Sequence, residues 1–274
     1  MLKLWIEENK IEKPNYPNKM EFYEFQEKIE ITKGIKKDIA KRVLLSLKDP
    51  MYLRFRFNNK TSEEIEKYVN SILPNRNARF YPQKSTWGEI ISAEILNVFR
   101  EHLIPIYKLR YKERKDKAMR GEADVVTYYF YENTLIIAFT EVKTKGNINS
   151  NSSSEYKKEM GKAEKGLLKN NVNEPEILEY LCERLFDEKK YSLLQKFDYA
   201  YNNPESYEKE FHIFMIIEKD RWQEKIIEFF KEDVTELPNL TINIVLINSL
   251  NDLIDETYEI IPKIAEDIIN DFEE

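Results

Sequence analysis

The residues best suited to chemistry lie in and just before one apolar segment, Thr134–Lys145. Apolar side chains fill every position from Leu135 to Phe139, so both faces of a strand here are apolar, as in the buried centre of a sheet. Glu141 and Lys143 continue the face that carries Phe139. A charged pair at the end of a buried strand costs free energy unless it is matched or used, and this pair is therefore the first candidate for chemistry.

A second carboxylate precedes this segment. Asp124–Phe130 is another apolar run, and the dipeptide Glu132-Asn133 between the two runs predicts a two-residue hairpin loop. With that loop, Asp124 lies directly opposite Glu141, where Cβ atoms are about 4.5–5.5 Å apart and two carboxylates repel. Such a pair favours a proton or a divalent cation between its members. A three-residue loop would break this register, and Glu-Asn is a weaker turn sequence than Asn-Gly.

The ligand types indicate which cation this pair would bind. Carboxylate oxygens from Asp124 and Glu141, with the carbonyl oxygen of Val142, suit Mg²⁺ or Mn²⁺ rather than zinc. A metal there would polarise a phosphoryl oxygen and lower the pKa of a bound water. Lys143, on the same face, would orient or deprotonate that water or neutralise charge developing on the phosphate. The set predicts phosphodiester hydrolysis, and the alternative is a plain salt bridge between Glu141 and Lys143.

The elements that must position these residues alternate between helices and strands, which indicates an α/β (α+β) fold. Apolar periodicity and capping residues predict helices at Lys36–Leu47, Thr61 or Ser62 to Ile72, Trp87–Glu101, Glu155–Leu168, Pro175–Leu185, Trp222–Phe230 and Asn251–Phe272, the last with a kink or break at Pro262. Alternating or β-branched-rich runs predict strands at Met51–Phe57, Leu103–Lys112, Asp124–Phe130, Thr134–Thr144, Phe211–Ile217 and Thr241–Ile247.

One stretch of the sequence predicts a division of the chain. A stretch rich in proline, asparagine and arginine around Leu73–Lys84 predicts a boundary between an N-terminal mixed α/β region, residues 1–84, and a core with an acidic C-terminal helical stretch, residues 85–274. The chain has six glycines, and three of them, Gly88, Gly121 and Gly146, punctuate the region around the acidic pair. Gly88 opens the predicted helix, and Gly121 and Gly146 stand where a sharp turn or the close approach of a ligand to the backbone would be wanted.

Charge is distributed unevenly along the chain. Residues 232–274 contain twelve Asp and Glu and one Lys, a net charge of −11, so the other residues carry +4 of the overall −7. Residues 101–120 contain seven basic and three acidic side chains. The overall acidity therefore does not exclude a nucleic-acid substrate.

Several classes of protein are excluded by composition. There is no run of about 18 apolar residues and no signal peptide, so we expect a soluble cytoplasmic protein without membrane association. The single Cys182 excludes a disulfide framework, and the wide sequence separation of His102 and His212 argues against a Cys/His zinc cluster.

The motifs together resemble a known group of nucleases. Gly88-Glu89 opening a helix, then Gly-Glu-Ala-Asp124, then Glu141-Val-Lys143 ending an apolar strand are similar to the PD-(D/E)XK nuclease superfamily. The resemblance covers Ser85–Leu168 and implies a restriction-endonuclease-like core, with a mixed central sheet flanked by helices and the active site at the hairpin. Ala123 stands where the superfamily usually has proline, a departure that is common within it.

A narrower resemblance follows from the order W-G-E, R-G-E-A-D and E-V-K, the chain length and the extra N-terminal region. These resemble the family of nuclease subunits of the Hachiman anti-phage defence system. That resemblance implies a bacterial DNase effector with a superfamily 2 helicase partner, HamB-like, which holds the nuclease in check until aberrant or invading DNA is sensed. The alternatives are a non-catalytic scaffold or regulatory subunit with this fold, and a repair or restriction nuclease.

The resemblance also implies residue roles. Asp124 and Glu141 would be the metal-binding acids and Lys143 the catalytic lysine. Glu89 matches the carboxylate contributed by the helix, and Glu94, near the apolar stripe of that helix, is the alternative.

A basic row leads toward Asp124. Alternate residues of the predicted strand and its continuation share one face and would contact DNA phosphates without reading sequence: Lys108, Arg110, Lys112 and Arg114, joined by Lys115, Lys117 and Arg120. Lysines of the next helix, Lys157, Lys158, Lys162 and Lys165, would extend this surface or simply keep the helix soluble.

Overall fold

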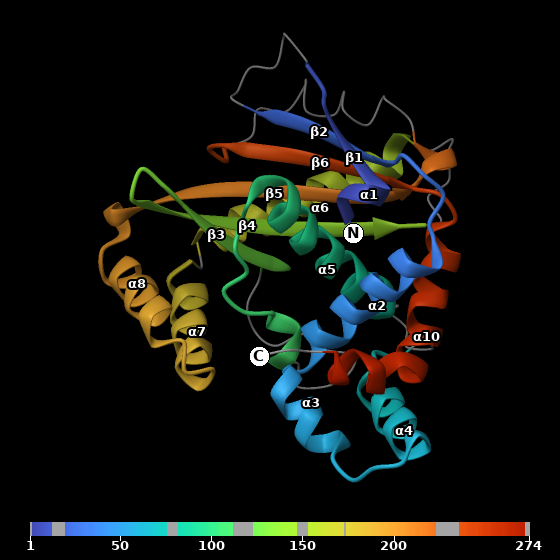
Figure 1. The fold of residues 1–274 in the computed structure, drawn as a ribbon. Helices are drawn as coiled ribbons and strands as arrows, with labels where there is room; N and C mark the ends of the chain where they lie inside the picture. The colour runs from blue at the N-terminus through green and yellow to red at the C-terminus, as the bar shows by residue number, and fades with distance from the viewer. Residues whose placement is uncertain are drawn as a thin grey trace.

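A computed structural model describes residues 2–12, 20–75, 82–111, 123–146, 153–172, 174–222 and 236–271. Within these residues, six strands form one mixed sheet in the order β1-β2-β6-β5-β4-β3 (Figure 1). The strands are β1 (Ile6–Lys10), β2 (Glu21–Glu27), β3 (Val125–Tyr131), β4 (Thr134–Lys145), β5 (Tyr207–Glu218) and β6 (Leu240–Ile247). The outer pairs β1/β2 and β3/β4 are antiparallel, and the inner pairs are parallel. The predicted α/β class with a mixed central sheet is confirmed.

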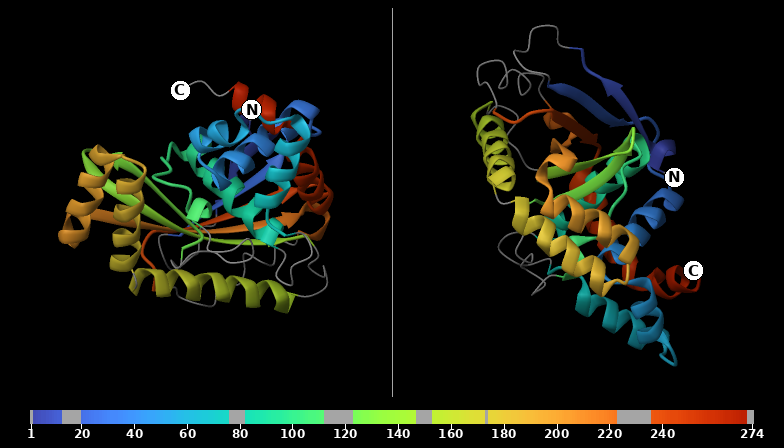
Figure 2. Two further views of the ribbon diagram at one scale, coloured as in Figure 1. Left: turned by 90° about the horizontal axis from the view of Figure 1, so that it is seen from below. Right: turned by 90° about the vertical axis from the view of Figure 1, so that its left-hand side faces the viewer.

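Helices cover both faces of this sheet (Figure 2). On one face lie α1 (Leu2–Trp5), α2 (Lys33–Leu47), α3 (Pro50–Phe57), α4 (Ser62–Ile72), α5 (Pro82–Arg100) and α10 (Leu250–Asn270). On the other face lie α6 (Ser153–Val172), α7 (Glu174–Asp187) and α8 (Tyr191–Asn202). Short 3₁₀ helices, η1 (Lys108–Tyr111), η2 (Pro204–Ser206) and η3 (Lys219–Arg221), connect elements.

Each face of the sheet has its own hydrophobic core, because successive apolar side chains of the central strands point to opposite faces. Val142 and Phe214 pack with the helices of the first layer, whereas Phe139 and Ile213 pack with α6, α7 and α8. The prediction that Thr134–Lys145 is a central buried strand is confirmed, since β4 lies between β3 and β5. Strands β1 and β2 of the N-terminal region belong to the same sheet, with β2 hydrogen-bonded to β6.

The hairpin that carries the candidate residues has the predicted register. Glu132 and Asn133 both have positive φ, 47° and 70°, the backbone of a two-residue type I′ turn. Tyr131 pairs with Thr134 and Val125 with Thr140, so continuing the ladder by one step brings Asp124 opposite Glu141.

Two predicted strands are wrong. Met51–Phe57 is part of helix α3, because Asp49 caps the helix by accepting the backbone N–H of Tyr52 and Pro50 occupies its first turn. Leu103–Lys112 is not a strand either. It makes one bridge, Leu103 with Tyr128, and then turns into η1. The interior Pro105 cannot donate to a strand ladder, which accounts for the interruption.

The acidic C-terminal stretch is a packed helix rather than a free tail. Helix α10 continues through Pro262 and buries one apolar face, including Ile254, Ile261 and Ile269, against the first helical layer. The helix predicted at Trp222–Phe230 lies mostly outside the described residues. No helix in the described part of the chain has the length and apolar character needed to span a membrane.

Candidate functional site

The open end of the β3/β4 hairpin, opposite its turn, brings three predicted residues together. Asp124 Oδ2 accepts the backbone N–H of Val142 at 2.8 Å, which fixes this carboxylate beside the end of β4. Lys143 Nζ donates to Glu141 Oε1 at 2.5 Å, and both side chains are largely buried. Asp124, Glu141 and Lys143 therefore form one cluster, at the end of the face of β4 that α6 covers.

Electrostatics within this cluster favour added positive charge. Burial and the neighbouring Asp124 raise the pKa of Glu141 to about 7, even though Lys143 and Lys108 act in the opposite direction. Burial lowers the pKa of Lys143, but the carboxylates of Glu141 and Asp124 outweigh it and the net shift is upward. Two adjacent acids that repel each other in a buried place suit a divalent cation, and their oxygen donors are of the kind that Mg²⁺ or Mn²⁺ prefers.

Helix α6 is shaped to accommodate the Glu141 carboxylate. A Cβ atom at Gly166 would lie 3.0 Å from both Cδ and Oε2 of Glu141, a contact tighter than side chains normally make. Gly88 likewise allows α5 to approach β4 closely, since a Cβ atom at Gly88 would lie 1.9 Å from Thr144 Oγ1. The sequence analysis placed Gly88 at the start of a helix, whereas it lies inside α5, which begins at Pro82. The close approaches at Gly88 and Gly166 were both missed, because they depend on tertiary contacts. Gly121 lies outside the described residues.

The two candidate helix carboxylates have different surroundings. Glu89 is half-buried and lines a small cavity that Asp124 and Lys108 also line, at the edge of the sheet where β3 begins. Glu94 is buried and binds Arg42, and its Oε1 accepts the hydroxyl of Tyr107 at 2.6 Å. The geometry therefore favours Glu89 for the site and a structural role for Glu94.

The basic row is only partly described. Lys108 donates to the carbonyl of Ala123 and lies close enough to lower the pKa of Glu141. Arg110 points elsewhere, to Glu188 at 2.9 Å and to the carbonyl of Leu45. The remaining members, Lys112, Arg114, Lys115, Lys117 and Arg120, lie outside the described residues. Because η1 replaces the predicted strand, the premise that Lys108 and Arg110 share a strand face is wrong.

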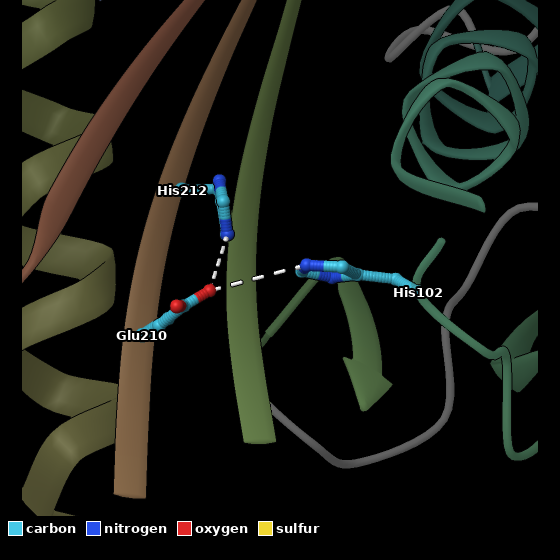
Figure 3. Close-up of side chains that lie close together, drawn as sticks. All are labelled: His102, Glu210 and His212. Atoms are coloured by element: carbon cyan, nitrogen blue, oxygen red, sulfur yellow. Dashed lines mark ion pairs between the residues drawn. The ribbon is translucent and has the colours of Figure 1, made fainter. Parts of the chain in front are cut away.

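A second cluster was missed by the sequence analysis. His102, Glu210 and His212 converge on the opposite face of the sheet, with all ligating atoms within 4.8 Å of one another (Figure 3). The argument from sequence separation against a histidine cluster fails, since the loop after α5 brings His102 to 5.6 Å from His212 between ring centroids. Glu210 and His212 are two residues apart, which indicates that they share one face of a strand, and this spacing was the feature of the sequence that could have pointed to the cluster.

Together, the fold and the hairpin cluster define an α/β protein whose mixed sheet carries an acidic pair and two lysines at the open end of the β3/β4 hairpin. The chain belongs to the HamA family, the family of Hachiman nuclease subunits, whose sequence model matches residues 1–261. This membership confirms the narrower of the two resemblances. No curated protein matches the chain.

Proposed function

We propose that this protein is a metal-dependent DNA nuclease of the PD-(D/E)XK type and the effector of a Hachiman anti-phage defence complex. The observation that carries the proposal is the convergence of Asp124, Glu141 and Lys143 at the hairpin end. Membership of the HamA family supports the defence role. A superfamily 2 helicase would be the partner that controls the nuclease.

The carboxylates of Asp124 and Glu141, with the carbonyl of Val142, would hold Mg²⁺ or Mn²⁺, and Glu89 would complete the acidic set from α5. When bound, such an ion supplies Lewis-acid polarisation of the scissile phosphate and acidifies a water. The residues around the two carboxylates position them. The Val142 N–H holds the Asp124 carboxylate in place, and Gly166 leaves space for that of Glu141.

Lys143 has two roles in this proposal. Its ammonium group compensates Glu141 in the resting protein, at 2.5 Å. With Glu141 holding a cation, Lys143 would donate to a non-bridging phosphate oxygen and stabilise charge there in the transition state. Lys108, whose ammonium group lies near the acidic pair, is a second donor to the same phosphate.

Further phosphate contacts would come from the helix that covers the site. Lys158, Lys162 and Lys165 are exposed on α6, and Lys112, Arg114 and Arg120 remain proposed contacts. Arg110 is bound to Glu188 and to the carbonyl of Leu45, so we assign it to the structure rather than to DNA. Contacts of this kind position a duplex without reading its sequence.

Plasmid degradation by the purified protein, alone and with its helicase partner, tests this proposal in Mg²⁺, in Mn²⁺ and in EDTA. We expect cleavage in either metal and none in EDTA. Lys143→Met should lower the rate at least about tenfold, because one donor to the transition state is lost. Lys37→Met, on the exposed side of α2, is the matched control. Metal-independent cleavage, or equal rates for the two variants, would contradict the proposal.

A further inference from the structure

The cluster of His102, Glu210 and His212 lies on the face of the sheet opposite the hairpin cluster, where His212 pairs with Thr140, the residue before Glu141. Glu210 and His212 point to the same face of β5, and His102 reaches them from the loop that follows α5 (Figure 3). His102 and His212 are each 3% exposed. Within the described residues, this is the one group of three or more His, Cys, Asp or Glu side chains with ligating atoms so close together.

We propose that His102, Glu210 and His212 form a structural binding site for a divalent transition metal such as Zn²⁺, separate from the nuclease site. Two imidazole nitrogens and one carboxylate oxygen are a donor set that zinc, iron, cobalt and manganese share. The set contains nitrogen donors, which Mg²⁺ disfavours.

The distances suit such a metal. Glu210 Oε2 lies 3.4 Å from His212 Nε2 and 3.9 Å from His102 Nε2. Ligands about 2.0–2.1 Å from a tetrahedral zinc ion are about 3.3–3.4 Å apart. The first distance already has this value. The second is longer, and the three ligating atoms lie within 4.8 Å of one another, so metal binding requires His102 to move closer to the other two ligands.

A second set of side chains orients these ligands. His102 Nδ1 lies 2.9 Å from Thr127 Oγ1, and His212 Nδ1 lies 3.4 Å from Asn243 Nδ2. A flip of the Asn243 amide, which exchanges its nitrogen and oxygen, would let His212 Nδ1 donate a hydrogen bond and leave the Nε2 lone pair facing Glu210. Metal-binding histidines are oriented by partners of this kind. The hydroxyl of Tyr129 donates to the other oxygen of Glu210.

Two polar atoms at this place lack hydrogen bonds among the described residues. They are His212 Nε2 and Thr140 Oγ1, both buried, and Thr140 is the direct neighbour of His212 across β4 and β5. His212 Nε2 lies 3.4 Å from Glu210 Oε2, an ion-pair distance, but neither His212 Nε2 nor Thr140 Oγ1 makes a hydrogen bond among the described residues, and buried polar atoms without one are costly. A metal would satisfy His212 Nε2, and a water as fourth ligand would satisfy Thr140 Oγ1.

Co²⁺ and Zn²⁺ binding to the full-length chain tests the assignment, in a background of Asp124→Asn and Glu141→Gln that disables the hairpin site. We expect one equivalent of Co²⁺ with the intense visible absorption of a tetrahedral ion, and a higher Tm with Zn²⁺. Adding His212→Gln or Glu210→Gln should weaken binding at least about a hundredfold and remove the Tm shift. Glu208→Gln, an exposed acid on the same strand, should change neither.

Circular dichroism in EDTA checks that each variant is folded. If His212→Gln is not folded, the test rests on Glu210→Gln, because glutamine keeps an oxygen that can accept the hydrogen bond from Tyr129. The proposal is overturned if the double variant binds no stoichiometric Co²⁺ or Zn²⁺. It is also overturned if Glu210→Gln binds both metals as tightly as its parent.

Discussion

At the scale of single residues, Glu89 and Glu94 lie on the same helix, five positions apart, in different surroundings. Glu89 lines the cavity at Asp124, whereas Glu94 is buried and bound to Arg42 and Tyr107. We predict that Glu94→Gln costs about 3 kcal/mol of unfolding free energy, since Arg42 loses its buried partner. Glu89→Gln should leave the stability nearly unchanged and lower the nuclease rate. Urea unfolding and plasmid degradation separate the two effects, and the reverse pattern would make Glu94 the site carboxylate.

Glu141 carries a second prediction at this scale, on pH. Its folded pKa of about 7 is above the ordinary value of a glutamate, so ionising it favours the unfolded state. The unfolding free energy in EDTA should therefore fall as the pH rises from about 4.5 through 7. Glu141→Gln removes this titration, and the variant should gain in Tm relative to the parent between pH 5 and pH 8. A constant difference across this range would contradict the assigned pKa.

At the scale of elements, the approach of α6 to β4 depends on Gly166. Gly166→Ala adds a methyl group 3.0 Å from the Glu141 carboxylate, while alanine itself favours the helix by up to about 1 kcal/mol. We predict a stability close to that of the parent, and a nuclease rate lowered about ten- to a hundredfold because the carboxylate is displaced. The control is Gly34→Ala on α2, where the nearest atom is 3.8 Å away. Equal activity of both variants would show that α6 does not position Glu141.

The elements also show where sequence patterns succeed and fail. The hairpin register was predictable because β4 is apolar on both faces and its loop has two residues. Met51–Phe57 alternates apolar and polar residues like a strand, but Phe55 is 73% exposed and the core contacts are Leu53 and Phe57, one helical turn apart. The cap at Asp49 and Pro50 was the decisive local feature. The spacing of Glu210 and His212 indicates that they share a strand face, but the approach of His102 depends on tertiary contacts that no local pattern encodes.

At the scale of the whole molecule, six of the twelve acidic residues in residues 232–274 lie on α10, a helix that the core requires. Deleting α10 would expose the layer into which Ile254 and Ile261 pack, so deletion cannot isolate the effect of charge. Neutralising exposed acids does so. We predict that Asp252→Asn, Asp267→Asn and Asp271→Asn together tighten DNA binding, most at low salt, because repulsion of the phosphates decreases. Fluorescence anisotropy at two salt concentrations measures this, and unchanged affinity at both would contradict the prediction.

The central claim is that the buried acidic pair at the hairpin end performs DNA hydrolysis. The most direct measurement is the rate of DNA cleavage in Mg²⁺ by Glu141→Gln beside that of Glu179→Gln, an exposed glutamate on α7. Loss of about 3 kcal/mol of transition-state stabilisation corresponds to a rate at least about a hundredfold lower. We predict this loss for Glu141→Gln, in a protein that remains folded, and parental activity for Glu179→Gln. Equal cleavage rates for the two folded variants would contradict the claim.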